Sequence, residues 1–476
     1  MSPAPPSAPT GPPVPPPLPP SPLSPVTVVG IGADGWAGLP AGSRAALREA
    51  DVLIGGPRQL ALLPGECAGE RVTWPSPLRP AVTGLLAAHA GRRVAVPASG
   101  DPMFYGIGRT LSEVLREVLG ADALRAGALR VLPHPSSVSY ACARLGWPVE
   151  DTEVVTLVGR PTELLAAALH DGRRVLVLSA GAGTPAEVAA LLTERGYGPS
   201  RMHVLEQLGP EQLGREQLGP EPLGLEQLGG DGEYGPGRER HVEGIAQEWA
   251  EPAGDPLNVV AVECRRAPDA PRLGAVPGLP DAAYAHDGQL TKRHVRAATL
   301  AALAPAPGEL LWDIGGGSGS IAVEWMRTHR TCRAVSVERD PARAERIGRN
   351  ARALGVPGLR VVTGGAPGAL AGLPVPDAVF IGGGLTVPGL LESCWDALPA
   401  GGRLVANTVT LESEALLAAW YRRLGGELVR LAVAHAVPVG GFTGWRQAMP
   451  VTQWAVTKDH PPRVPSAGAP SAGEER

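Results

Sequence analysis

A glycine-rich turn in the C-terminal half is the part of the chain best suited to hold a ligand. An apolar segment that ends beside Asp313 is followed by three alternating glycines and then by a helical stretch over 321–328. Glycines allow close approach of the backbone to a ligand, and the first N–H groups of a helix have no partner within the helix. The turn is therefore predicted to bind a nucleotide-like ligand.

The spacing around this turn distinguishes between two cofactors. Glu338, which closes the next apolar segment, supplies a carboxylate suited to the two hydroxyls of a ribose. A dinucleotide fingerprint G-x-G-x-x-G would need glycine at position 320, where the chain has Ser320. The turn instead reads D-x-G-x-G-x-G, as in class I methyltransferases, and Asp313 is expected to face a cationic amino acid better than a pyrophosphate. S-adenosylmethionine is the predicted cofactor, and NAD is rejected.

In the N-terminal half, one glycine motif is misleading and a later loop is more informative. Residues 30–35 fit the dinucleotide fingerprint, but the candidate ribose acid, Asp51, precedes the next apolar segment and so lies at the wrong end of a sheet. The loop 99–108 presents small residues, the acid Asp101 and two aromatics after an apolar strand. The hydroxyls of 135–139 stand at a helix start, where they either bind a ligand or only cap the helix.

Two bodies must position these segments, and in each body apolar strands alternate with helices rich in alanine, leucine and arginine. This alternation is typical of α/β folds. The expected organisation is a disordered proline-rich arm over 1–25, a first domain over 26–264, a linker over 265–280, a second domain over 281–458 and a disordered tail over 459–476.

The first domain is expected to have two lobes, split near Pro133, around one site. It also contains an internal repeat from Glu206, in which leucines recur every five residues from Leu208 to Leu228. Such leucines cannot form one stripe on a helix, and a glycine in each unit weakens a helix further. Residues 206–238 are therefore interpreted as an expanded surface loop.

Composition excludes several classes of function. The chain has 43 basic and 47 acidic residues, a formal net charge of -4, and so lacks the basic surface of a nucleic-acid-binding protein. Its 5 cysteines are scattered, without the spacing of a metal site, and are typical of reduced thiols in a cytoplasmic protein. No apolar stretch is long enough to span a membrane. We expect a cytoplasmic protein without a nucleic-acid partner, membrane association or bound metal.

Several motifs together resemble known families. In the first body, VTVVGIGADG, ADVLIGGPRQL, SGDPMFYGIG, PSSVS and VGRP resemble the tetrapyrrole methylases of cobalamin biosynthesis, of the precorrin carbon-5 type. In the second body, AHDGQLTKRHVRA, WDIGGGSGSIAVEW, GGAPGAL and GGRLVANTVTLESEA resemble the precorrin carbon-15 methyltransferase and decarboxylase type. The two in this order resemble the bifunctional precorrin-6B methyltransferases (decarboxylating).

This resemblance implies an α/β protein with an N-terminal two-lobed tetrapyrrole methylase domain (class III methyltransferase) and a C-terminal Rossmann-like class I methyltransferase domain. It implies that S-adenosylmethionine, bound at two sites, methylates precorrin-6B at carbons 5 and 15, and that the ring-C acetate loses carbon dioxide, giving precorrin-8X. The expected partner is a small-molecule tetrapyrrole, and we expect a homo-oligomer. The alternative is a methyltransferase for another small molecule with a non-catalytic N-terminal binding module.

The resemblance also implies the cofactor-binding residues. The first cofactor site would include Asp101, Phe104, Ser136 and Ser137. The second would include Thr291, Gly315, Gly316, Gly317, Ser318, Gly319, Glu338 and Ala366. Several positions depart from the family pattern, including Gly181, which falls in a loop that often carries Asp. Gly365 stands where an acid often contacts adenine, and Pro97 in a strand indicates an edge or a bulge.

Methyl transfer to a tetrapyrrole mainly needs alignment, because the meso carbons are enamine-like nucleophiles. The catalytic residue is unknown. Candidate proton sources for the decarboxylation are Lys292, His286 and His294. A precorrin carries many carboxylates, which arginine forks bind well. The candidates for this contact are Arg58, Arg109, Arg293 and Arg446, and for each of these side chains a solvated surface position is the alternative.

Overall fold

The computed structural model describes residues 25–209 and 239–459, which divide into two compact units. The first unit holds the described residues of 1–158, 174–187 and 201–263, and the second holds those of 159–173, 188–200 and 264–476. Apart from residues 25 and 459, the predicted arm and tail lie outside the described residues, as does the repeat from residue 210 onward. Within this range, no helix is long and apolar enough to cross a lipid bilayer.

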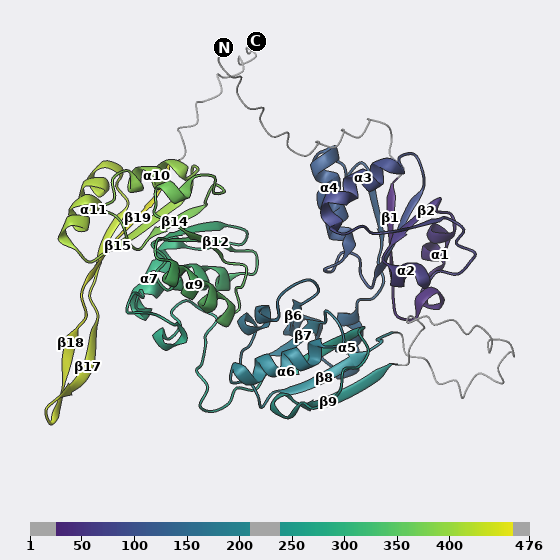
Figure 1. Ribbon diagram of the computed structural model, residues 1–476, viewed down its shortest axis with the longest axis horizontal. Coiled ribbons are helices and arrows are strands. Elements are labelled where there is room, and N and C mark those ends of the chain that lie inside the picture. Colours follow the sequence, from purple (N-terminus) through teal and green to yellow (C-terminus); the bar gives the residue numbers. More distant parts are fainter. Residues whose placement is uncertain (1–24, 210–238, 460–476) are drawn as a thin grey trace, which may run out of the picture. The chain divides into compact units, whose positions relative to one another are not determined.

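The first lobe is a parallel five-stranded sheet in the order β3-β2-β4-β1-β5. Figure 1 labels two of its strands, β1 and β2. Its strands are β1 (Val26–Ile31), β2 (Val52–Gly55), β3 (Glu70–Thr73), β4 (Val94–Ser99) and β5 (Leu129–Leu132). Its helices are η1 (Gly35–Gly38), α1 (Ala41–Arg48), α2 (Pro57–Ala61), α3 (Leu78–Ala88) and α4 (Ile107–Leu119). Along β1, Val28 belongs to one buried cluster and Val29 to another, as expected when both faces of a parallel sheet are covered.

Pro97 lies in β4, an inner strand, so the predicted sheet edge is wrong. The pairing of β4 with β2 covers only Val94 and Ala95, whereas the pairing with β1 continues to Ser99. Pro97 lies beyond the last pair on the β2 side, so its missing N–H breaks no ladder bond there.

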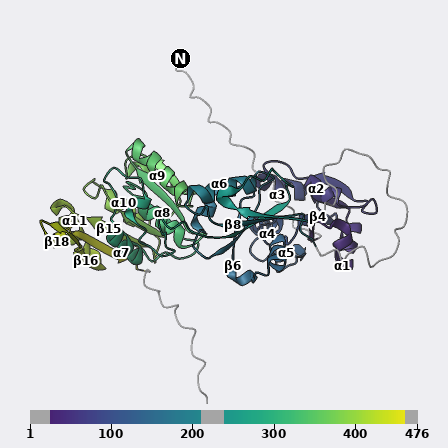
Figure 2. The ribbon, with the colours of Figure 1, turned by 90° about the horizontal axis from the view of Figure 1, so that it is seen from below.

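The second lobe is a mixed five-stranded sheet in the order β6-β7-β10-β8-β9. Figure 2 labels two of its strands, β6 and β8. Its strands are β6 (Thr152–Thr156), β7 (Arg174–Leu178), β8 (Arg201–Glu206), β9 (Arg240–Ile245) and β10 (Asn258–Glu263). Its helices are α5 (Ser137–Leu145), η2 (Val149–Asp151) and η4 (Ala246–Glu248). Next to them in the sequence, η3 (Thr162–Ala167) and most of α6 (Thr184–Glu194) lie in the ranges of the second unit. The first residues of the predicted surface loop are part of this lobe, because Glu206 ends β8 and Leu208 is buried.

The C-terminal sheet has seven strands in the order β13-β12-β11-β14-β15-β19-β16, of which β19 and β16 run antiparallel to their neighbours. Its strands are β11 (Leu310–Ile314), β12 (Arg333–Glu338), β13 (Arg360–Thr363), β14 (Ala378–Ile381), β15 (Arg403–Thr408), β16 (Glu427–Leu431) and β19 (Val451–Thr457). Its helices are η5 (Asp281–Ala283), α7 (Arg293–Leu303), α8 (Ser320–Thr328), α9 (Pro341–Ala353), η6 (Gly368–Leu370), α10 (Leu390–Ala397) and α11 (Leu411–Leu424).

Buried residues from α7, α8 and α9 form the core on one face of this sheet, and those from α10 and α11 form the core on the other. In such an open α/β sheet, ligands bind beyond the carboxyl ends of the strands, where β11 and β12 end in the glycine turn and Glu338. A separate two-stranded ribbon, β17 (Ala434–Val439) with β18 (Phe442–Gln447), extends away from the sheet (Figure 1). The sheets and their layered helices confirm the predicted α/β fold class.

Candidate functional site

The first unit contains a cavity of about 400 Å³, a volume within the usual range for a small-molecule site. Its lining comes from both lobes. The first lobe contributes the ends of β1 and β4 and the loop after β4, and the second contributes the start of α5 and residues of β8 and β10, such as Leu205 and Val259. A ligand in this cavity would therefore contact both sheets.

Gly30, in the 30–35 segment, allows close packing at the end of β1, next to this cavity. A Cβ on Gly30 would lie 2.2 Å from the carbonyl oxygen of Gly100 and 2.7 Å from the backbone nitrogen of His134. Gly30 therefore lets the segments that follow β4 and β5 pack directly on the end of β1. This packing explains the glycine motif without a dinucleotide.

The four predicted cofactor residues of this unit, Asp101, Phe104, Ser136 and Ser137, all line the cavity. Asp101 also orders its own loop, since its Oδ1 accepts the Met103 N–H at 2.8 Å. Ser136 caps α5 by accepting the N–H of Ser139 at 3.2 Å. Ser136 therefore both caps α5 and lines the cavity. Contact of these four residues with a cofactor stays a prediction.

Of the two candidate arginines in this unit, only Arg58 lines the cavity. Its Nη1 donates to the Ser99 hydroxyl at 3.3 Å, and burial lowers the pKa of its guanidinium. Gln59, a lining residue that sequence reasoning missed, donates to the same hydroxyl at 2.6 Å. Arg109 instead pairs with Glu113, one turn along α4, at 2.8 Å and is not part of the lining.

In the second unit, the glycine turn depends on conformations that side chains disfavour. Gly315, Gly317 and Gly319 have φ of 72°, 59° and 76°, in the left-handed region. At Gly316 the constraint is space, because a Cβ there would lie 2.1 Å from the Ser336 hydroxyl. The turn therefore needs glycine at each of these positions.

The turn presents hydrogen-bonding groups that fit a nucleoside with an amino acid group. Glu338 is only 4% exposed, and its carboxylate accepts the Gly317 N–H at 2.8 Å and the Asp340 N–H at 3.0 Å. Each carboxylate oxygen can accept a further bond, as a ribose diol would require. Ser318 has a buried hydroxyl with no hydrogen-bond partner among residues 25–209 and 239–459. These groups fit S-adenosylmethionine.

The expectation for Asp313 is wrong. Its side chain lies beneath the turn, 1% exposed, and accepts a hydrogen bond from the Ser336 hydroxyl at 3.2 Å. Burial raises the pKa of this carboxyl to about 7, although the bonds from Ser336 and the Ala322 backbone oppose the shift. Asp313 therefore joins β11, β12 and α8 and does not face a cationic group.

Beside the turn lies the segment 278–292, termed here the lead segment, and Asn350 of α9 joins the two. Its side-chain amide donates to the carbonyl oxygens of Ser318 at 2.8 Å and Ala285 at 2.9 Å, and accepts the N–H of Ala285 at 2.9 Å. Asp287 of the lead segment is paired with Arg343 and Arg346, both at 2.9 Å, which lowers the pKa of its carboxyl. These bonds hold the lead segment against the turn.

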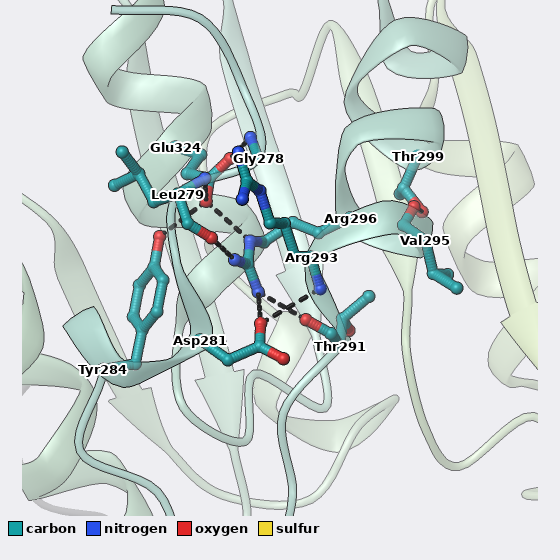
Figure 3. Close-up of polar contacts among 10 residues, drawn as sticks. All are labelled: Gly278, Leu279, Asp281, Tyr284, Thr291, Arg293, Val295, Arg296, Thr299 and Glu324. Atoms are coloured by element: carbon teal, nitrogen blue, oxygen red, sulfur yellow. Dashed lines mark hydrogen bonds and ion pairs between the residues drawn. The ribbon is translucent and has the colours of Figure 1, made fainter. Parts of the chain in front are cut away.

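A buried ion pair anchors both ends of the lead segment (Figure 3). The Nε of Arg296, on α7, donates to Glu324, on α8, at 2.6 Å, with side chains 0% and 2% exposed. Glu324 also accepts the N–H of Gly278 at 2.5 Å and the Tyr284 hydroxyl at 2.8 Å. Arg296 reaches the Thr291 carbonyl oxygen at 2.5 Å. Sequence reasoning missed this pair.

The proposed proton sources lie on or next to the lead segment. Thr291 is half-buried, whereas Lys292, His286 and His294 are exposed. Arg293, also exposed, is fixed through its backbone N–H, which donates to Asp281 at 3.0 Å. No described contact gives these side chains a catalytic partner, so their roles stay predictions.

The two remaining predicted residues lie on other elements. Ala366 follows β13 and is half-buried, and its segment is tied to Glu338 because the Gly364 N–H donates to the Glu338 carbonyl oxygen at 2.9 Å. Arg446 is exposed on β18 and faces His435 across the ribbon. The His435 ring lies 5.8 Å from that of His294, so the base of the ribbon lies near the start of α7.

A Rossmann-like sheet with this turn, preceded by a two-lobed α/β unit around a cavity, defines the class of S-adenosylmethionine-dependent methyltransferases. Family models agree with both parts. The model described as tetrapyrrole (corrin/porphyrin) methylases matches residues 25–217, and the model described as a precorrin methyltransferase domain matches residues 282–458.

Named relatives cover nearly the whole chain. It is 47% identical over 431 residues to the precorrin-6Y C(5,15)-methyltransferase (decarboxylating) of a Sinorhizobium species, which covers 90% of this chain and 96% of the relative. It is 49% identical over 434 residues to the protein of that name from Mycobacterium tuberculosis (strain CDC 1551 / Oshkosh), covering 90% and 99%. The crystal structure of the C-terminal domain of the Rhodobacter capsulatus protein is 50% identical, covers 39% of this chain and 100% of that domain, and has a TM-score of 0.38. The chain belongs to the family of precorrin-6Y C(5,15)-methyltransferases (decarboxylating).

Proposed function

We propose that this chain methylates precorrin-6B at carbons 5 and 15 and decarboxylates its ring-C acetate, giving precorrin-8X in cobalamin biosynthesis. Similarity along 90% of the chain to relatives named as C(5,15)-methyltransferases (decarboxylating) supports the two methylations and the decarboxylation. The identity of the methyl acceptor, precorrin-6B, is more specific than the names of these relatives and is part of the proposal.

The observation that carries the proposal is the presence of a separate candidate cofactor site in each unit. The first unit has the cavity lined by Asp101 and Ser136, and the second has the glycine turn with Glu338. We assign methylation at carbon 5 to the first unit, and methylation at carbon 15 and the decarboxylation to the second. Each unit would then bind one S-adenosylmethionine.

The chain's own residues would mainly bind and orient. Bound S-adenosylmethionine supplies the methyl group, and the gain from alignment of the reacting atoms is about 7–11 kcal/mol. Arg58, which lines the cavity, and the exposed Arg293 and Arg446 are the proposed contacts of substrate carboxylates, while Arg109 already pairs with Glu113. Lys292, His286 and His294 are the candidates for the proton that replaces carbon dioxide.

Mass spectrometry of the products tests this division of labour. The full chain is incubated with precorrin-6B and S-adenosylmethionine, and we expect two added methyl groups and the loss of one carbon dioxide. The Gly317→Asp variant, altered only in the turn, is expected to add at most one methyl group and to keep the carboxyl group. Decarboxylation by this variant at the wild-type rate would refute the assignment to the second unit.

The alternative, a non-catalytic N-terminal binding module, predicts a different result for the first unit. Gly30→Ala places a Cβ against the Gly100 carbonyl oxygen and should disturb the cavity. If the first unit is catalytic, the variant adds a single methyl group. Two methyl groups added at the wild-type rate would favour the binding module.

We also propose a homo-oligomer, supported by exposed apolar side chains on the ribbon β17–β18. Phe442 is 84% exposed and Trp445 is 78% exposed, which is unusual for large apolar side chains on one short element. Light scattering on wild type should give more than one chain per particle, and Trp445→Ser should shift the mass downward. Val276→Ser, at another exposed apolar residue, is the control. A monomeric wild type would contradict the proposal.

A further inference from the structure

A cluster of two histidines and a glutamate lies on the sheet of the second lobe. His203 is on β8, and His241 and Glu243 are on β9. One ligand atom from each, a ring nitrogen or a carboxylate oxygen, lies within 4.8 Å of the other two. We propose that His203, His241 and Glu243 bind a divalent transition-metal ion of the zinc type.

Strand register brings the three side chains to one face. His203 is directly opposite Glu243 in the antiparallel β8–β9 pair, and His241 is two residues from Glu243. Residues two apart in a strand point to the same face, so all three converge there. His203 is far in the chain from His241 and Glu243. The sequence therefore contains no short metal-binding motif for this cluster.

The distances suit a shared metal ion. His203 Nδ1 lies 3.1 Å from His241 Nε2 and 3.5 Å from a carboxylate oxygen of Glu243. Two imidazole nitrogens on one tetrahedral zinc, each about 2.0–2.1 Å from the metal, would be about 3.3 Å apart. Without an ion, the 3.1 Å contact requires one of the two rings to donate its only N–H to the other.

A fourth residue orients the buried ligand. His203 Nε2 lies 3.3 Å from a carboxylate oxygen of Glu263, on the neighbouring strand β10. An N–H donated to Glu263 leaves the lone pair of His203 on Nδ1, the atom that faces His241. A ligating histidine that donates its other N–H to a carboxylate is the usual arrangement at metal sites. The Trp147 ring is nearly perpendicular to that of His203, with ring centres 6.2 Å apart.

A neighbouring ion pair fixes which carboxylate oxygen of Glu243 faces the cluster. Arg201 lies 3.4 Å from the other carboxylate oxygen of Glu243, Oε1, so Oε2 is the atom that faces His203. Two imidazoles and one carboxylate select zinc, cobalt or nickel over magnesium or calcium.

The ion would fasten β9 to β8. Among residues 25–209 and 239–459, β9 pairs on one side only and is the edge strand of the second lobe. An edge strand is held less firmly than an inner one. Three protein ligands leave a fourth position for water on the side where His241 and Glu243 are exposed. The expected role is stabilisation of the lobe, separate from methyl transfer.

Calorimetry on full-length, tag-free protein stripped with a chelator tests this site. We expect ZnCl2 to bind at one ion per chain and to raise the Tm, while MgCl2 does neither. CoCl2 should give the visible absorption of a tetrahedral Co²⁺ site. His241→Ala should abolish the zinc heat and the cobalt absorption, and Glu263→Gln should weaken binding about tenfold. His329→Ala, in the other unit, should behave as wild type.

Two results would overturn the proposal. One is a wild-type protein that binds no zinc, and the other is a His241→Ala variant that binds zinc and gives the cobalt absorption as wild type does. The Tm of metal-free His241→Ala is compared with that of metal-free wild type. This comparison separates a loss of zinc binding from a loss of folding. Methyl transfer should be unchanged in this variant.

Discussion

The two units use similar glycine motifs for different physical purposes. In the first unit, Gly30 removes a side chain so that Gly100 and His134 can pack against the end of β1. In the second, Gly315 and Gly317 adopt left-handed conformations, and the Gly317 N–H points to Glu338. A glycine pattern therefore defines a ligand site only when the residues around it show which of the two purposes it serves.

The acidic residues near the two sites, Asp101 and Glu338, also have different structural roles. In the first unit, Asp101 binds the Met103 N–H of its own loop and lines a cavity between two sheets. In the second, Glu338 reaches across from the next strand to the turn. The first site depends on two lobes and the second on one sheet edge, so damage to either should leave the other intact.

The largest expected effect on cofactor binding is that of Gly317→Asp. The substitution forces a side chain into a φ of 59° and places a second carboxylate beside Glu338. S-adenosylmethionine binding by the second unit should weaken at least about 100-fold, or about 2.7 kcal/mol, while the first unit keeps its site. Calorimetry measures both. Gly308→Asp, at an exposed glycine with φ of 92°, is the control and should keep two sites.

Next is the buried ion pair of the second unit. Arg296→Met leaves Glu324 charged and without its main partner in the protein interior, which should lower the free energy of unfolding of this unit by about 3–5 kcal/mol. Chemical denaturation followed by tryptophan fluorescence measures the change. Arg293→Met, at an exposed neighbour, should change it by less than about 0.5 kcal/mol. Equal effects of the two variants would show that the pair does not anchor the lead segment.

For the first unit, Gly30→Ala should cost about 1–3 kcal/mol of stability, because the new Cβ meets backbone atoms that cannot move aside easily. It should also remove the first cofactor site and leave the second. Gly42→Ala, in α1, has open space around the new Cβ and is the matched control. A Gly30→Ala protein with two intact sites would show that close packing at Gly30 is not needed.

The last effect, that of Asp313, depends on pH and is spread over several pH units. Its pKa of about 7 lies above the unfolded value near 4, so between these pH values the folded protein holds a proton that the unfolded chain releases. Stability conferred by this group should fall as pH rises through that window, by at most about 1.4 kcal/mol per pH unit, and level off above about pH 7. Unfolding of wild type and Asp313→Asn across this range gives the difference. Parallel profiles would contradict the shift.

Sequence reasoning located the features that depend on neighbours in the chain. The glycine turn and Glu338 follow from strand ends and the conformations of glycine, and the loop with Asp101 follows from its place after β4. The position of Asp313 was misjudged, because its burial depends on Ser336, on the neighbouring strand.

Features made by distant residues were missed. Arg296 and Glu324 lie on different helices, and only the fold brings them together. A partial signal exists, since Arg296 precedes Leu300 by four residues and therefore shares the buried face of α7. The amide of Asn350, which joins the turn to the lead segment, gives no such signal because its partners are backbone groups.

The central claim, one cofactor site in each unit, is tested most directly by calorimetric titration of the full-length protein with S-adenosylmethionine. Two molecules per chain are predicted for wild type. A wild-type stoichiometry of one molecule per chain would contradict it.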